Sequence, residues 1–261
     1  MVIDFHAHCF PDALAGKAVA HLENGCGIKA VHDGTADGLK EYMTRCGVGV
    51  SVVLPVATKP SQVNTINEWS LSTADDKLRF FGAVHPDDEN FYDVVSFLKA
   101  KGFKGVKLHP DYQRFYADEK RIMPLYEALR DAGLIAVFHA GVDIGLPSPI
   151  HCTPLMIKNI LESVKGLVVV AAHMGSHALW RDAEELLCGL PVFFDTSYSY
   201  YFLQREGMER MIRKHGAERV LFGTDSPWTS ADAEIERITS LHIPKSDMDK
   251  ILCRNALSLL I

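Results

Sequence analysis

The sequence lacks the features that mark several other classes of protein. No uncharged apolar run reaches the roughly 18 residues that a membrane-spanning helix needs, and the first residues do not resemble a signal peptide. Lys and Arg number 27 against 33 Asp and Glu, so the net charge of −6 provides no general affinity for nucleic acid or an anionic membrane. We therefore expect a soluble, cytoplasmic protein without a nucleic-acid or membrane partner.

Cysteine pairs of the zinc-finger kind are also missing. The six cysteines are scattered, with no CxxC pair, and in a chain of this length we expect them to be reduced thiols. Apolar residues make up 48% of the chain and charged residues 23%, values typical of a soluble globular protein. This composition excludes a disordered chain or a fibrous repeat. It predicts a single folded domain over residues 1–261.

Short apolar runs rich in Val, Ile and Phe recur along the chain, separated by segments with helical periodicity. Such runs are typical of strands buried on both faces of a parallel sheet. Strands alternating with helices in this way predict a (β/α)8 barrel, known as a TIM barrel. An open doubly wound sheet is the alternative, but no Gly-rich phosphate loop follows the first run. The predicted strands are Val2–His8, Val50–Val56, Phe80–Pro86, Phe103–Pro110, Leu134–Gly141, Leu167–Gly175, Pro191–Ser197 and Val220–Pro227.

One connection between predicted strands is much longer than the others. Residues 9–49 contain several glycines and a helical pattern near Leu39–Cys46. We interpret this segment as an insertion in the first loop of the barrel, followed by the first outer helix. Loops that follow the strands of a barrel surround its active site. The insertion is therefore expected to shape the substrate pocket.

Histidine is abundant, with 12 residues in the chain, and several stand at the ends of predicted strands. His6 and His8 point to the same side, because residues two apart in a strand share a face. The strand ends of a barrel converge, and burying many polar groups together is unfavourable unless something binds them. Imidazole and carboxylate groups suit zinc, manganese, iron, cobalt or nickel. The residues at these ends are His6, His8, Lys107, His109, His139, His173 and Asp225.

Six segments of the chain form a recognisable combination. They are Asp4-Phe5-His6-Ala7-His8, Gly105-Val106-Lys107-Leu108-His109-Pro110, Phe138-His139-Ala140-Gly141, Ala172-His173-Met174-Gly175, Phe222-Gly223-Thr224-Asp225-Ser226-Pro227-Trp228 and Asn255-Ala256-Leu257-Ser258-Leu259-Leu260. The chain thereby resembles the amidohydrolase superfamily of metal-dependent hydrolases, and in particular its amidohydrolase-related branch. The combination is specific for the superfamily but names no substrate.

The resemblance implies a role for each strand-end residue. His6, His8, His139 and Asp225 are expected to bind the more buried metal, and Asp225 also to accept a proton from the metal-bound water. His173 either hydrogen-bonds that water and the substrate or binds a second metal. Zinc is the expected ion, as one or two per chain.

Lys107 is the ambiguous residue of this set. It stands where dihydroorotase-like enzymes of the superfamily have a carboxylated lysine that bridges two metals. In the amidohydrolase-related branch this position varies and one metal is usual, and a free Lys107 would instead bind a substrate carboxylate. A metal-free site, as in some lactonases of the branch, is the third alternative.

The predicted activity is hydrolysis of an amide, cyclic amide or lactone carbonyl in a small polar substrate. Alternatives are non-oxidative decarboxylation of an aromatic or unsaturated acid by the same metal site, and a degenerate barrel that binds without catalysis. A homodimer is the default expectation. His85, His109 and His177 are candidates for substrate binding; the alternatives are a solvated histidine at a Pro-terminated strand end for the first two and a surface histidine at the start of a helix for His177. We expect His21, His32, His215 and His242 on the surface.

Overall fold

The strands of the protein run parallel and form a (β/α)8 barrel, which confirms the predicted fold. The computed structural model describes residues 1–146 and 148–261. Its strands pair in the orders β1-β2-β3 and β4-β5-β6-β7-β8-β9. The strands are β1 (Val2–Ala7), β2 (Val48–Val53), β3 (Leu78–Phe80), β4 (Gly82–Ala83), β5 (Gly105–Leu108), β6 (Ile135–Phe138), β7 (Val169–Ala171), β8 (Phe193–Asp195) and β9 (Val220–Leu221).

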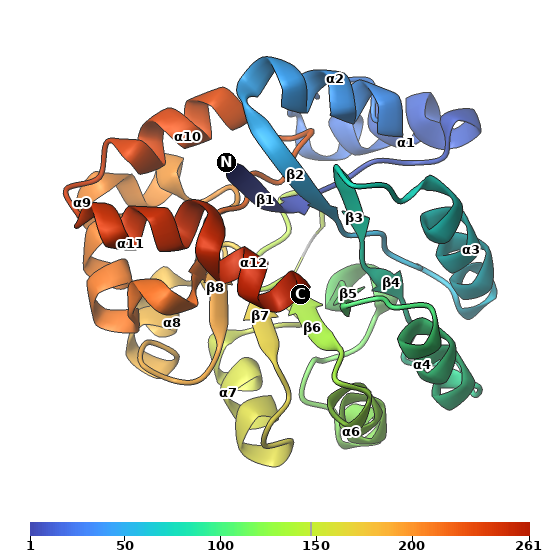
Figure 1. The fold of residues 1–261 in the computed structure, drawn as a ribbon. Coiled ribbons are helices and arrows are strands. Elements are labelled where there is room, and N and C mark those ends of the chain that lie inside the picture. The colour runs from blue at the N-terminus through green and yellow to red at the C-terminus, as the bar shows by residue number, and fades with distance from the viewer. Residues whose placement is uncertain (147) are drawn as a thin grey trace.

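Hydrogen bonds at two seams join these strands into one closed barrel (Figure 1). At one seam only Phe81 separates β3 from β4, and its N–H donates to the carbonyl of Val53 on β2 at 2.9 Å. At the other, the N–H of Phe5 on β1 donates to the carbonyl of Phe222, directly after β9, at 2.8 Å. The first and last strands of the chain are therefore neighbours.

Helices cover the outside of the barrel and direct an apolar face toward the strands (Figure 1). On α6, for example, Leu125, Tyr126 and Leu129 are buried on one side. Inward-pointing side chains fill the barrel, and the rings of Phe5 and Phe81 meet edge to face there at 5.6 Å. The helices are α1 (Asp12–Cys26), α2 (Ala36–Cys46), α3 (Val63–Thr73), α4 (Phe91–Ala100), α5 (Pro110–Gln113), α6 (Met123–Ala132), α7 (Pro154–Ser163), α8 (Trp180–Leu186), α9 (Tyr200–His215), α10 (Ala231–Thr239), α11 (Lys245–Asp249) and α12 (Asn255–Leu260).

The last helical segments close the end of the barrel at which the strands begin. A π-helical turn over Lys250–Arg254 and α12 pack against β1 and β9, and Figure 1 shows α12 in front of the barrel. Ala256 of α12 belongs to the inner core. The side chain of Lys104, which precedes β5, donates to the carbonyl of Ile261. The strand carboxyl ends therefore lie at the other end of the barrel.

Two helices, α1 and α2, occupy the long connection between β1 and β2. α2 packs against β2, as an outer barrel helix does, and its first turn is capped by Thr35, whose Oγ1 accepts from the N–H of Gly38 at 2.9 Å. α1 is the additional helix. Its end lies close to the loop after β6, because a Cβ on Gly145 would be 3.7 Å from a backbone carbon of Gly25. α1 therefore reaches the side of the barrel where the strands end.

Two histidines expected on the surface are not there. His215 is 1% exposed, because its Nε2–H donates to the carbonyl of Val192 at 2.9 Å and its ring stacks on Phe194 at 4.0 Å. His32 is partly buried, with its Nε2 3.0 Å from the hydroxyl of Ser226. The prediction is wrong for both, since neither partner is near in sequence. It is confirmed for His21 and His242, which are exposed.

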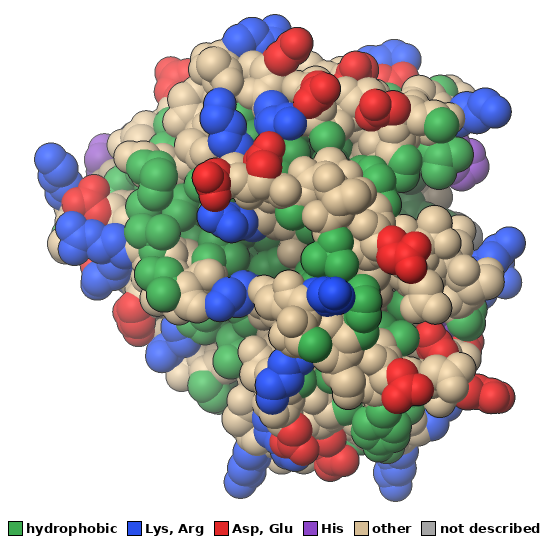
Figure 2. All heavy atoms as spheres, turned by 45° about the vertical axis from the view of Figure 1, so that its right-hand side comes forward, with side chains coloured by type: hydrophobic (Ala, Val, Ile, Leu, Met, Phe, Trp, Pro, Cys, Tyr) green, Lys and Arg blue, Asp and Glu red, His purple; other side chains and the backbone are tan. Residues whose placement is uncertain are grey.

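The surface carries charges of both signs. Figure 2 shows Lys and Arg side chains interspersed with Asp and Glu over one face, with hydrophobic side chains between them. This mixture agrees with the small net charge of −6. Among the described residues, no helix is both long and apolar enough to cross a membrane.

Candidate metal centre

His6, His8 and Asp225 meet at the carboxyl ends of the first and last strands. The Oδ1 of Asp225 lies 3.3 Å from the Nε2 of His6 and 3.1 Å from the Nε2 of His8. Alternation along β1 directs both imidazoles to one side. Pairing of the two strand ends places the carboxylate against them, since the N–H of Asp225 donates to the carbonyl of His6 at 2.8 Å.

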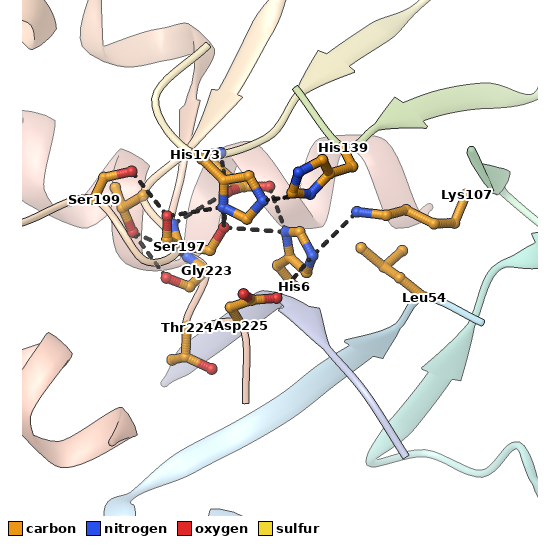
Figure 3. Close-up of polar contacts among 12 residues, drawn as sticks. His6, Leu54, Lys107, His139, His173, Ser197, Ser199, Gly223, Thr224 and Asp225 are labelled. Atoms are coloured by element: carbon orange, nitrogen blue, oxygen red, sulfur yellow. Dashed lines mark hydrogen bonds and ion pairs between the residues drawn. The ribbon is translucent and has the colours of Figure 1, made fainter. Parts of the chain in front are cut away.

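His139, His173 and Lys107 complete the cluster from β6, β7 and β5 (Figure 3). The Nδ1 of His139 is 3.1 Å from the Nε2 of His173, and the rings of His173 and His6 are 5.2 Å apart. The Nζ of Lys107 donates to the Nε2 of His6 at 3.1 Å. The Nε2 of His139 is buried and has no hydrogen-bond partner among the described residues. The structure thus brings together the six residues predicted as metal ligands.

Three imidazoles of the cluster share one protonation pattern. The Nδ1 of His8 faces the carbonyl of Leu54 at 3.1 Å, and the Nδ1 of His173 faces the carbonyl of Ser197 at 3.1 Å. A carbonyl only accepts, so each Nδ1 carries a proton. Burial lowers the pKa of both His8 and His173, so both imidazoles are neutral and each Nε2 has a lone pair. The Nδ1 of His6 likewise donates to the carboxylate of Asp195 at 2.9 Å.

This pattern tests whether the residues fit a metal. Two lone-pair nitrogens, from His6 and His8, face the carboxylate of Asp225 at 3.1 to 3.3 Å. Acceptors this close repel one another unless a cation lies between them. Imidazole nitrogen and carboxylate oxygen are also the ligands that Zn²⁺ and Mn²⁺ accept. The donor set of His6, His8 and Asp225 therefore fits a divalent metal, whereas the ligand atoms of His139 lie together with those of His109 and Asp143.

Asp195, at the end of β8, is a central residue that the sequence reasoning misses. Its Oδ2 accepts from His6, while its Oδ1 accepts from the N–H groups of His173 and Ser197, each at 3.1 Å, and from the Ser197 hydroxyl. One carboxylate therefore orients the imidazole of His6 and anchors the backbone of His173, as residues around the ligands of a metal site commonly do. The available signal is its position, since it follows Phe193 and Phe194 at a predicted strand end.

Burial and charge keep the carboxylate of Asp225 ionised and the imidazole of His173 neutral. Burial alone would raise the pKa of Asp225, but the neighbouring His6 and His8, when protonated, outweigh it and hold that pKa well below its usual range, and a cation bound in their place would act in the same direction. Burial lowers the pKa of His173 to about 3 and that of Lys107 to about 8. Asp225 is therefore available as a proton acceptor at neutral pH.

The backbone adopts a left-handed conformation at two of the clustered residues and at Met174. Asp225, His173 and Met174 all have positive φ values, of 68°, 60° and 53°. Non-glycine residues rarely adopt this conformation, and it concentrates at functional sites. The N–H of Met174 donates to the carbonyl of Asp195 at 2.7 Å, which helps hold the turn after β7.

The family model described as amidohydrolase matches residues 3–260, nearly the whole chain. The chain belongs to the amidohydrolase family. The predicted resemblance is thereby confirmed at the level of the superfamily. The carboxylation of Lys107 in the manner of dihydroorotase stays a prediction. No curated protein matches the chain.

Solved structures with the same fold cover this amidohydrolase almost completely. An uncharacterized TIM-barrel protein from Bordetella bronchiseptica has a TM-score of 0.77 at 20% identity, covering 99% of this chain and 98% of that one. A 2,6-dihydroxybenzoate decarboxylase from Rhizobium has a TM-score of 0.72 at 15% identity, covering 99% and 98%. A 5-carboxyvanillate decarboxylase from Novosphingobium aromaticivorans, complexed with manganese, has a TM-score of 0.74 at 14% identity, covering 100% and 96%. At 14% to 20% sequence identity, the similarity to these three structures establishes the fold.

The amidohydrolase places two of the three predicted substrate-binding histidines next to the cluster. The ring of His109 stacks on His139 at 4.1 Å, and its Nε2 lies 3.2 Å from the carboxylate of Asp143. His177 lies 6.1 Å from His173, ring to ring, and its Nδ1 is buried without a hydrogen-bond partner in the described part of the chain. These positions adjoin the metal ligands, and the roles stay predictions.

His85 has a different environment in the amidohydrolase. It is 3% exposed, and its Nδ1 accepts from the N–H of Asp87 at 3.1 Å within the turn that follows β4. No hydrogen bond or ring contact of the described residues links it to the cluster. His85 is thus buried within this turn, whereas the alternative to substrate binding was a solvated histidine at the strand end, and a role in substrate binding stays a prediction.

Proposed function

We propose that this amidohydrolase is a metal-dependent hydrolase of a small polar substrate, acting on an amide, cyclic amide or lactone carbonyl. Membership of the family supports a metal-dependent enzyme. The observation that carries the proposal is the pair of lone-pair nitrogens, from His6 and His8, that face the carboxylate of Asp225 at 3.1 to 3.3 Å. A divalent metal held there would polarise the carbonyl and lower the pKa of water to roughly 7.

The protein's own residues would perform three tasks in this reaction. His6, His8 and Asp225 would hold the metal, with His139 as the fourth ligand. Asp225, ionised at neutral pH, would accept a proton from the attacking water and pass it to the leaving group. His173, with its lone pair on Nε2, would orient the water or bind a second ion. The solved relatives named with manganese favour testing Mn²⁺ beside Zn²⁺.

In this proposal, the number of bound metal ions depends on whether the amine of Lys107 is free or carboxylated. Its Nζ donates to the Nε2 of His6, so the amine must move aside or be carboxylated when His6 binds a metal. Burial lowers its pKa to about 8, so a fraction of the amine is neutral, as the reaction with CO2 requires. Metal content measured with and without added bicarbonate separates the two forms, because only the carboxylated form bridges two ions.

Decarboxylation is the second candidate, and two observations favour it. A buried amine at Lys107 is placed to hold a substrate carboxylate beside the metal ligands. Several solved structures with this fold are named as decarboxylases. Both reactions would use the same metal, so the products must distinguish them.

To test the proposal, the Mn²⁺-loaded and Zn²⁺-loaded enzymes are each assayed with two panels of compounds. One panel contains cyclic amides and lactones, and the other contains aromatic and unsaturated carboxylic acids. Hydrolysis is expected to produce a new carboxylic acid from the first panel without release of CO2. CO2 released from the second panel, with the first unchanged, would establish decarboxylation instead.

A further inference from the structure

A cavity of about 340 Å³ adjoins the metal centre but contains none of its ligands. It lies between the starts of α9 and α10. The N–H of Trp228 donates to the carbonyl of Asp225 at 2.8 Å, and the ring of Tyr198 is 5.6 Å from His177. Its size is within the ~300–1,000 Å³ of ordinary ligand pockets. Its aromatic lining consists of Tyr198, Tyr201, Phe202 and Trp228.

Glu234 is the acidic residue among those that line this cavity. It belongs to the buried face of α10 together with Ala231 and Ile238, and is 1% exposed. Its Oε1 accepts from Arg237 at 2.6 Å. Its Oε2 is buried and has no hydrogen-bond partner among the residues that the structure describes. A buried acceptor without a hydrogen-bond partner is unfavourable. A ligand that donates a hydrogen bond to Oε2 would remove this cost.

We propose that this cavity binds the amine end of the substrate, as an ammonium group carried on a flat apolar body. The inference rests on the proposed function for the identity of the ligand as substrate. An ammonium N–H would satisfy the Oε2 of Glu234. The four aromatic side chains would pack on the apolar body and attract the cation through their faces.

The charges around the cavity select an amine over an acid. Arg237, which also lines the cavity, is already paired with Glu234 and lies 5.8 Å from the centre of the Tyr200 ring. A substrate carboxylate at the Oε2 of Glu234 would face a second acceptor and be repelled. Burial also raises the pKa of Glu234, which Arg237 only partly opposes, and a bound cation would stabilise the ionised form.

The test measures binding without turnover, so it does not depend on the reaction. Phenethylamine and 2-phenylethanol have nearly the same shape, but only the amine carries a charge at neutral pH. Each is titrated into the metal-loaded protein by calorimetry. The amine is expected to bind about tenfold or more tightly, as a charged hydrogen bond provides. Glu234→Gln should abolish this preference. Glu236 is an exposed residue of the same helix, so the control variant Glu236→Gln should retain the preference.

A second variant, Tyr201→Ala, tests the proposal independently in case Glu234→Gln does not fold. Tyr201 is 68% exposed, so Tyr201→Ala should keep the melting temperature. It is expected to weaken the amine more than the alcohol, because it removes a ring that faces the cation. Equal affinity of both probes, no binding of either, or the same loss in Glu236→Gln would overturn the proposal. A hydrolase assay that fails while the amine preference holds would contradict only the proposed function.

Discussion

At the scale of single residues, the site is defined by which nitrogen of each imidazole carries a proton. His6, His8 and His173 each direct an Nδ1–H to an oxygen, so each presents an Nε2 lone pair. The oxygens belong to different segments, namely a side chain of β8, the end of β2 and the residue Ser197. The predicted ligand atoms are therefore oriented by partners that lie outside the predicted ligand set.

The first prediction concerns Asp225. Asp225→Asn keeps the size of the side chain but removes its charge, and the amide cannot accept a proton from water. We expect activity to fall by roughly 10²- to 10⁴-fold, as for the loss of a general base. The melting temperature of the metal-free protein should change little. The exposed Asp76→Asn is the control, and turnover that remains unchanged in Asp225→Asn would contradict the assigned role.

The second prediction concerns Asp195, which acts as a positioning residue through His6. In Asp195→Asn, an amide nitrogen can face the Nδ1–H of His6 and so favour the wrong tautomer. We expect affinity for Mn²⁺ to fall by about 10- to 100-fold. Activity should recover in part at high metal concentration, which a general loss of structure would not allow. Competition with a chelator measures the affinity, and the exposed Asp131→Asn should match the unchanged protein.

At the scale of elements, three of the site side chains lie in the turns that follow their strands. β6 ends at Phe138 before His139, β7 ends at Ala171 shortly before His173, and β9 ends at Leu221 well before Asp225. The predicted strands are longer than the observed ones because the same apolar runs continue into these turns. The chain leaves regular pairing there, and positive φ values at His173 and Asp225 re-aim their side chains.

A third prediction concerns His215 at the end of α9. Burial lowers its pKa to about 4, below the 6.5 of an exposed imidazole. The unfolded chain therefore binds more protons between these values, and stability is complete above pH 6.5 and falls as the pH drops toward 4. The loss is about 3 kcal/mol at most.

Urea unfolding at pH 7 and pH 4.5 tests this prediction. His215→Phe should be less stable at both values, because Val192 loses its donor, but should show a smaller difference between them. His242→Gln, at an exposed position, should keep the full difference. The same pH difference in His215→Phe as in the unchanged protein would assign the effect to other groups.

At the scale of the whole molecule, a closed barrel brings distant segments to one rim. The barrel and the strand-end histidines were predictable, because the alternation of apolar runs and helices repeats along the sequence. Asp195 also stands at a predicted strand end, but its contact with His6 was not predictable, because the two residues are 189 positions apart. The environments of His32 and His215 were not predictable for the same reason. The cavity beside Trp228 depends on how α9 and α10 pack, which composition does not determine.

The fourth prediction concerns the metal and the stability of the whole barrel. A ligand that binds the folded state at 100 times its dissociation constant stabilises it by about 2.7 kcal/mol. For a protein of this size that corresponds to a rise in melting temperature of roughly 5 to 10 °C. We therefore expect chelation to lower the melting temperature by this amount and re-addition of Mn²⁺ or Zn²⁺ to restore it. A melting curve unaffected by chelator, in protein purified without chelator, would contradict a bound metal.

The contact between the first and last strands determines when, during synthesis and folding, the candidate metal ligands come together. His8 and Asp225 are 217 positions apart, so during synthesis His6 and His8 leave the ribosome long before their carboxylate partner. Contacts of such long range form late in folding. A nascent chain therefore carries an incomplete set of ligands for most of its synthesis. A metal held by these residues would therefore be bound tightly only after the barrel closes, as the last step of assembly.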